Sequence, residues 1–328
     1  SQDGVRRGVR SRRRFPLISP NVNPEHLALL VKAEWQLSYV TPLYQFRHTQ
    51  LRSYSRQLAA FIVAEKQQGL AVEVSELHNS YRVSLSVVQG LTESEDDAET
   101  VLIQVSMFYS IRDEPQRSVW SGWLTCVHGS PEYLRSLPKD FTCLPLFGSR
   151  GPEYLSRVVK SWFQKTFDCC FGSLEINHTS LQWFAALWTD CHSQSHIQHL
   201  RMLWTIPAAP PLQITYTVDH QDAWDLWNSV RKGPTAAVAE DAASIDLEEV
   251  TGFLQALKSH FYRHFRLDLS AGTLQQVSTA VGSAKSSGRI KVPLVSGVFL
   301  LLARLVVFFS FYQIIVKMYY MIDWLKLK

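Results

Sequence analysis

Residues 41–74 constrain the fold most, because their pattern changes from that of a helix to that of a strand. Their apolar residues first recur at steps of three and four, which places them on one helical face: Leu51, Tyr54, Leu58, Phe61, Ile62 and Ala64. Gly69 suits the end of the helix, since glycine readily adopts the left-handed conformation found there. Residues 70–74 then alternate with the period of two typical of a strand. The segment predicts a helix that covers a sheet.

Further alternation predicts antiparallel strands at residues 83–87, 101–107 and 119–127, each with one face toward water, and another strand at 212–218. Residues 152–191 have a helical pattern and carry six large aromatic side chains: Trp162, Phe163, Phe167, Trp183, Phe184 and Trp188. Such side chains bury large areas, so we expect a packed core between layers. An aromatic cage for a ligand is the alternative.

Polar residues mark three helix starts. Asn23 predicts a short helix that ends near Trp35, and Asp219 caps a second helix. Asp246 with Glu249 resembles a capping box, and the helix that follows has an apolar face: Leu247, Val250, Leu254, Leu257 and Phe261.

The sequence also predicts a linker and a C-terminal β-meander. Residues 233–243 are rich in glycine, proline and alanine, which is typical of a linker. After the last helix, strands are expected at residues 265–269, 274–281 and 289–291, joined by turns.

The charge is unevenly distributed along the 328 residues, whose net charge is +4. The first 14 residues hold one acid, Asp3, and six arginines, which leaves about −1 for the rest: Arg6, Arg7, Arg10, Arg12, Arg13 and Arg14. Such an arm is either a solvated or nuclear-import segment or a nonspecific phosphate contact. The five cysteines form no CxxC pair, which favours buried, reduced thiols in an intracellular protein.

Catalytic and metal-binding patterns are weak. Zinc suits thiolate and imidazole ligands, but Cys191 and the nearby His192, His196 and His199 lack a second cysteine pair. His260 and His264 stand four apart, yet they follow an amphipathic helix. There is no GxSxG, no HExxH and no glycine-rich phosphate loop. We expect no enzyme activity, no metal and no cofactor.

Three stretches resemble the vertebrate centromere protein L family: FIVAEKQQGLAVEV at residues 61–74, WFQKTFDC at 162–169 and HFYRHFRLDL at 260–269. The resemblance spans about residues 21–291. It implies a noncatalytic structural subunit of the constitutive centromere-associated network, located at the kinetochore in the nucleus. It also implies pairing with centromere protein N through the C-terminal regions of both proteins. Such a heterodimer would help to link centromeric nucleosomes to the kinetochore, in support of kinetochore assembly and chromosome segregation.

The expected fold class is α+β, with antiparallel sheets packed against helices and a C-terminal meander used for heterodimerisation. Four segments are expected: a disordered basic arm at 1–20, an N-terminal domain at 21–205, a C-terminal dimerisation domain at 206–291 and an atypical apolar tail at 292–328. An unpaired strand edge can accept a strand from a partner. The predicted edge residues are Thr273, Gln275, Val277, Thr279, Val281, Arg289, Ile290 and Lys291.

A DNA-binding surface is the second expectation. Its phosphate-binding residues would be the six arm arginines together with Arg266, Lys285, Arg289 and Lys291. The nucleosome and its DNA would then be contacted directly, whereas a pure scaffold would contact them through other subunits.

The tail departs from the family pattern. Residues 292–316 carry one charge, Arg304, and their apolar run approaches the ~20 residues that span a bilayer. Pro293 and Lys317 interrupt or bound the run. The alternatives are an atypical tail, a helix buried against a partner, and a membrane anchor at residues 292–322. A membrane partner is the least favoured of these.

Overall fold

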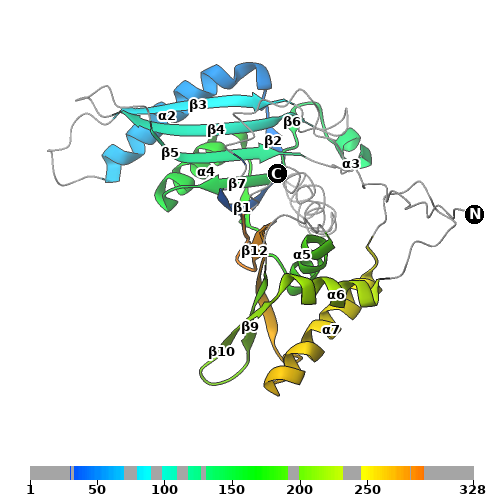
Figure 1. The fold of residues 1–328 in the computed structure, drawn as a ribbon. Helices are drawn as coiled ribbons and strands as arrows, with labels where there is room; N and C mark the ends of the chain where they lie inside the picture. The colour runs from blue at the N-terminus through cyan, green and yellow to red at the C-terminus, as the bar shows by residue number, and fades with distance from the viewer. Residues whose placement is uncertain are drawn as a thin grey trace, which may run out of the picture.

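The computed structural model describes residues 30, 33–69, 80–89, 98–108, 117–126, 131–190, 199–231, 245–280 and 282–291. In these residues eleven strands form one antiparallel sheet, on which six helices pack (Figure 1). The strand order is β10-β9-β11-β12-β13-β1-β7-β5-β4-β3, and β8 (Phe171–Ser173) pairs with β1. The prediction of an α+β fold built on antiparallel pairing is therefore confirmed.

The N-terminal half of the sheet has five long or central strands: β1 (Glu34–Val40), β3 (Ser80–Val88), β4 (Thr100–Phe108), β5 (Arg117–Thr125) and β7 (Leu146–Arg150). The three strands predicted from alternation are confirmed as β3, β4 and β5, and they pair antiparallel in that order. A separate small ribbon joins β2 (Leu43–Tyr44) to β6 (Phe141–Thr142). Two short helical segments complete this half, η1 (His48–Gln50) and α3 (Pro131–Ser136).

Helices α2 (Leu51–Gly69) and α4 (Glu153–Phe167) cover one face of this half (Figure 1). The predicted apolar face of α2 is buried at Leu51, Tyr54, Leu58 and Ile62, whereas Ala64 is exposed. These side chains share a core with Val101, Ile103 and Val105 of β4 and with the aromatic residues of α4. The strand expected at residues 70–74 lies outside the described residues.

The expected helix that ends near Trp35 is wrong at its end. Residues 21–29 lie outside the described part, but β1 begins at Glu34 and includes Trp35. β1 pairs with both β7 and β13, and Trp35, opposite Ile290 of β13, is buried. Pairing with strands distant in sequence decides the conformation of this segment, and no local signal reports it.

The C-terminal half of the sheet consists of β9 (Leu200–Ile206), β10 (Leu212–Val218), β11 (Thr273–Ser278), β12 (Ser283–Lys285) and β13 (Arg289–Lys291). Three helices, α5 (His178–Asp190), α6 (His220–Val230) and α7 (Leu247–Phe265), lie on one side of these strands (Figure 1). β9 pairs with β10 and β11, so it belongs with strands beyond the expected boundary at residue 205. The four-segment division itself stays a prediction.

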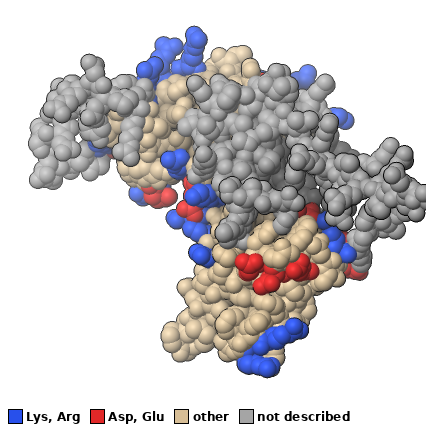
Figure 2. All heavy atoms as spheres, viewed as in Figure 1, with Lys and Arg blue, Asp and Glu red and all other residues tan. Residues whose placement is uncertain are grey.

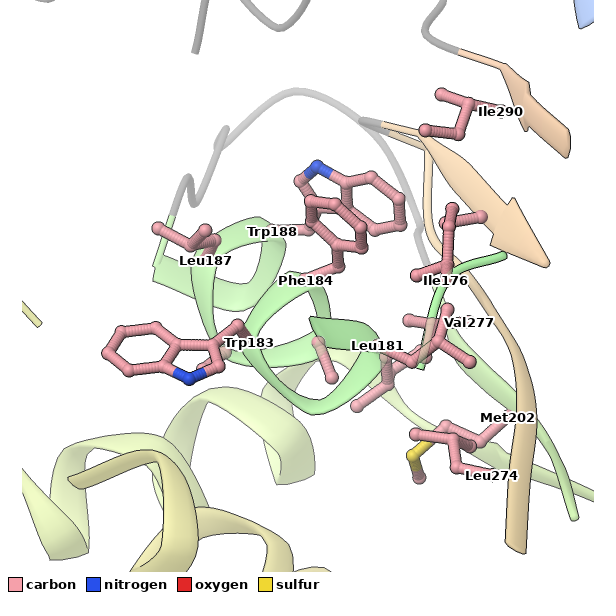
Figure 3. Packing of buried hydrophobic residues seen from close by; sticks show 14 of the residues in the cluster. Ile176, Leu181, Trp183, Phe184, Leu187, Trp188, Met202, Leu274, Val277 and Ile290 are labelled. Carbon is pink, nitrogen blue, oxygen red and sulfur yellow. The ribbon is translucent and has the colours of Figure 1, made fainter. Parts of the chain in front are cut away.

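Helix α5 forms the centre of this core. Figure 3 shows Phe184 and Trp188 of α5 beside Val277 and Ile290 of the strands. The Phe184 and Trp188 rings stack with centroids 5.2 Å apart. All six aromatic residues named from the sequence are buried, which confirms the prediction of a packed core.

The helix caps of α6 and α7 are confirmed. The Asp219 side chain accepts a hydrogen bond from the Gln221 backbone N–H. Asp246 and Glu249 form the reciprocal capping box at the start of α7. Of the predicted apolar face of α7, Leu247 is exposed and the other four members are buried.

The strand expected at residues 265–269 is wrong. α7 continues to Phe265, and Arg266 ends it in the left-handed conformation, with its N–H donated to the Tyr262 carbonyl oxygen at 2.8 Å. Phe265 and Leu267 are exposed, whereas Leu269 is buried. Alternating apolar residues at the end of an amphipathic helix imitate the period of a strand.

Candidate partner-binding surface

The strands predicted to form the partner edge are internal. β11 lies between β9 and β12, and β13 lies between β12 and β1. Val277 pairs with Met202 on one side and Ala284 on the other, and Ile290 pairs with Ala284 and Trp35. The edge assignment of these strands is therefore wrong, because both of their backbone edges are already used.

The remaining residues of that prediction follow the same ladders. Thr273 pairs with Thr205, and Gln275 lies at a register shift between β11 and β9. Thr279 follows β11 and donates its backbone N–H to the Gly282 carbonyl oxygen at 2.7 Å. Arg289 pairs with Gln36 and Lys291 with Glu34. Val281 lies outside the described residues.

Within the described residues, the terminal strands of the sheet are β10 and β3. β10 pairs with β9 over seven residues, from Leu212 opposite Ile206 to Val218 opposite Leu200. Leu212 is 50% exposed, and Gln213, Thr215 and Thr217 are exposed as well. The C-terminal half therefore has one long, regular strand edge with which no described strand pairs. The sequence indicated the strand but not its position in the sheet.

The predicted basic residues fall into two places. Lys285, Arg289 and Lys291 share one face of β12 and β13. Lys285 lies directly opposite Arg289, and Lys291 follows Arg289 by two residues, which is the period of a strand. Arg266 ends α7, which packs on the other face of the sheet. The arginines of the arm lie outside the described residues, so the structure brings together three of the ten predicted cations.

This face of the C-terminal strands, opposite α5, α6 and α7, is polar and accessible, and we call it the outer face. Its side chains alternate with the core residues and are polar apart from the half-buried Leu203: Arg201, Leu203, Thr205, Gln213, Thr215, Thr217, Thr273, Gln276, Ser278, Ser283, Lys285, Arg289 and Lys291. Glu34 is the acid nearest to them, and its carboxylate lies 2.7 Å from Lys285 Nζ. The Gln36 side-chain oxygen accepts a hydrogen bond from Arg289 Nε at 3.2 Å. The outer face therefore carries a net positive charge.

On the helical side, Tyr216 of β10 contacts His260 near the end of α7, and His264 lies beside His260. Tyr216 Oη and His260 Nδ1 are 2.5 Å apart, and the rings of His260 and His264 lie 4.5 Å apart. Burial, and then the Asp222 carboxylate, raise the pKa of Tyr216 to about 12. Burial lowers the pKa of His260, and His264 and Arg263 lower it further, while Asp222 opposes them.

This arrangement predicts how stability depends on pH. His260 stays neutral in the folded protein at pH values where the unfolded chain, with a histidine pKa near ~6.5, already binds a proton. The free energy of unfolding should therefore fall as the pH falls from about 7 toward 5. His260→Gln should weaken this dependence in urea titrations at each pH. His178→Gln, at an exposed position in α5, is the control, and equal effects of the two substitutions would contradict the assignment.

Comparison with known proteins decides the family. The family model described as centromere protein L matches residues 29–298. A Danio rerio protein named centromere protein L is 54% identical over 279 residues, which cover 84% of this chain and 74% of the relative. The Mus musculus and Homo sapiens proteins of that name are each 41% identical, over 87% and 86% of this chain and 85% and 80% of their own lengths. The chain belongs to the centromere protein L family.

Centromere protein L is a noncatalytic structural protein of the kinetochore, and membership associates this chain with the constitutive centromere-associated network. The match begins within one residue of the first described residue, Leu30, and extends past β13, so the eleven-stranded sheet is the centromere protein L region. The surfaces of this sheet are therefore the ones to consider for assembly with other proteins.

Most of the first metal pattern lies outside the described residues. Of the first group, His199 is described, and its Nδ1 lies 3.7 Å from Asp219 Oδ2; the other three residues lie outside the described part. Among the described residues no group of three or more histidine, cysteine or acidic residues could hold a metal ion. Four described cysteines are free, with Cys126, Cys143 and Cys169 buried and Cys170 exposed.

The apolar tail at residues 292–328 lies outside the described residues. Across the part of the chain that is described, none of the helices has both the length and the apolar character that crossing a membrane requires.

Proposed function

We propose that this member of the centromere protein L family pairs with centromere protein N through the C-terminal regions of both proteins, and that β10 receives the partner strand. The observation that supports this most directly is the position of β10 at the end of the sheet. The heterodimer would help to connect centromeric nucleosomes with the kinetochore, in support of kinetochore assembly and chromosome segregation.

Edge pairing suits β10 for two physical reasons. In an antiparallel strand the backbone groups of alternate residues point to opposite edges, so a terminal strand leaves half of its donors and acceptors for a new neighbour. An added strand gains main-chain hydrogen bonds, while side chains at alternate positions supply specificity. Leu212, half exposed at the start of β10, offers an apolar contact to such a strand.

A pair of proline substitutions tests this proposal. Ile214 and Thr215 are adjacent, so one of them donates its N–H toward β9 and the other toward the open edge. We expect the proline at the outward position to weaken heterodimer formation at least tenfold while leaving thermal stability nearly unchanged. The proline at the inward position should lower stability as well, because it removes a ladder hydrogen bond.

Isothermal titration calorimetry with purified centromere protein N measures the affinity, and thermal denaturation of each variant alone measures its stability. Ile214→Ala and Thr215→Ala serve as controls for the loss of each side chain. Normal affinity in both folded proline variants would show that β10 does not receive the partner.

A second candidate function is direct contact with DNA phosphates, and the grouping of Lys285, Arg289 and Lys291 on the outer face favours it. These cations share their face with Arg201 and with hydroxyl and amide side chains, which bind phosphate without reading bases. Arg266 lies apart from this group, and the arm arginines would add an independent contact.

Replacing Lys285, Arg289 and Lys291 by glutamine should weaken binding to duplex DNA. The slope of log K against log salt should fall by roughly 1 for each phosphate that the variant no longer binds. Fluorescence anisotropy at several salt concentrations measures both quantities. Arg52→Gln with Arg56→Gln, at exposed positions of α2, is the control for removing charge elsewhere. An unchanged slope in the triple variant would exclude the outer face as the DNA-binding surface.

A further inference from the structure

Three large apolar side chains are exposed together at the end of α7: Tyr262 is 50% exposed, Phe265 58% and Leu267 50%. We call them the α7-end patch. The other exposed large apolar residues in the described part of the chain lie on other elements or at the opposite end of α7: Tyr44, Val63, Tyr154, Leu212 and Leu247. The three members of the patch lie within residues 262–267, and exposed apolar side chains that are grouped mark an interaction site more often than scattered ones do.

The patch is held in place by the core beneath it. The Phe265 and Phe261 rings lie 4.7 Å apart, and the Phe261 and Tyr216 rings 4.8 Å apart, so Phe265 is the outer member of an aromatic row. Phe261 is buried. The backbone after α7 is fixed by the Arg266 cap and by Asp268, whose carboxylate accepts the Ser270 N–H at 2.8 Å. An ordered aromatic anchor loses little conformational entropy when it binds.

The patch has a cationic rim. Arg263 and Arg266 are exposed, and within the described residues neither has an acidic partner. Figure 2 shows Lys and Arg side chains gathered over the far end of α7, whereas Asp and Glu side chains gather in the region of α6. Tyrosine, phenylalanine and arginine together are the residue types enriched in protein interfaces.

The patch extends from the β10 side of α7 to the opposite side. His260 and Phe261 both contact Tyr216 of β10. Successive helix residues are rotated by about 100°, so Phe265 is turned by roughly 40° from Phe261 and continues the aromatic row outward, whereas Tyr262 is turned by roughly 200° from His260. A segment bound over Tyr262 would therefore lie on the side of α7 away from a strand added to β10.

We propose that the α7-end patch is a second protein-docking surface, whose partner is an acidic, apolar segment of a kinetochore protein other than centromere protein N. The apolar side chains supply the buried contact, and Arg263 and Arg266 select for acidic residues beside it. DNA would use the two arginines but would leave three large apolar side chains without a role. The proposal does not depend on the β10 edge.

Photo-crosslinking in a reconstituted inner-kinetochore assembly tests the proposal. Benzoylphenylalanine placed at position 265 should form adducts with an acidic, apolar segment of a subunit other than centromere protein N. The same probe at position 63, where Val63 is 38% exposed on α2, is the control. Adducts no stronger than at position 63, or adducts with DNA or centromere protein N, would overturn the proposal.

Affinity measurements complete the test. Phe265→Ser with Tyr262→Ser, and separately Arg263→Glu with Arg266→Glu, should weaken binding of the crosslinked subunit at least tenfold. Both double variants should keep the parent affinity for centromere protein N, measured in the same preparations. Unchanged binding of the crosslinked subunit by both variants would contradict the proposal, whereas a failure of the β10 proline test alone would leave it intact.

Discussion

Gly288→Ala is expected to lower the free energy of unfolding by about 3 kcal/mol or more. Gly288 joins β12 to β13 with a φ of +77°, a backbone conformation that side chains disfavour. A Cβ atom there would lie 1.9 Å from the Leu174 carbonyl oxygen, which belongs to the backbone and cannot rotate away. The Gly288 carbonyl oxygen also accepts the Leu37 N–H at 2.9 Å, so any displacement disturbs β1. Urea denaturation followed by circular dichroism measures the change.

Gly252→Ala is the matched control. Gly252 lies inside α7, where an added Cβ would meet Val230 at 3.5 Å, an ordinary contact. Alanine is the better helix former, so this variant should be more stable than the parent by about 0.5–1 kcal/mol. A Gly288→Ala protein as stable as the parent would mean that the β12–β13 turn differs from the one described.

Val277→Pro is expected to lower the free energy of unfolding by about 3 kcal/mol or more. We expect it to abolish partner binding only because the protein unfolds. Val277 is fully buried, and β11 has a hydrogen-bonded neighbour on each side. A proline in an internal strand removes a ladder hydrogen bond that no water can replace. Thermal denaturation and binding to centromere protein N are measured on the same samples.

Val277→Ala separates the ladder from the side chain. It keeps the backbone N–H and should cost only part of the stability, with binding preserved. A Val277→Pro protein that keeps the parent stability but loses the partner would restore β11 as a binding edge and would argue against β10.

Signals carried by neighbouring residues predicted much of this fold. The Asp219 and Asp246 caps, the buried face of α2 and the alternation in β3 and β4 each depend on residues a few positions apart. β9 and β12 escaped prediction because their pattern is short or irregular. β1 escaped because its partners lie more than a hundred residues away.

The partner surface was harder to predict for a related reason. An edge is a property of the strand order, and no feature of residues 273–291 distinguishes an internal strand from a terminal one. That Lys285, Arg289 and Lys291 share one face could be predicted from the sequence, because strand register follows from alternation and a short turn. The α7-end patch was missed because Phe265 and Leu267 were assigned to one face of a strand at residues 265–269.

The pairing of β1 with β13 has a consequence for synthesis. Glu34 of β1 lies opposite Lys291 of β13. During synthesis β1 leaves the ribosome early, and its hydrogen bonds with β13 can form only after residue 291 has been made. At typical rates of about 5–20 residues per second, that interval is on the order of 10–50 seconds. During it, Trp35 and Leu37 lack the neighbours that bury them in the finished protein. Translation speed and chaperone capture, in addition to sequence, would then influence how much of this subunit becomes available for assembly.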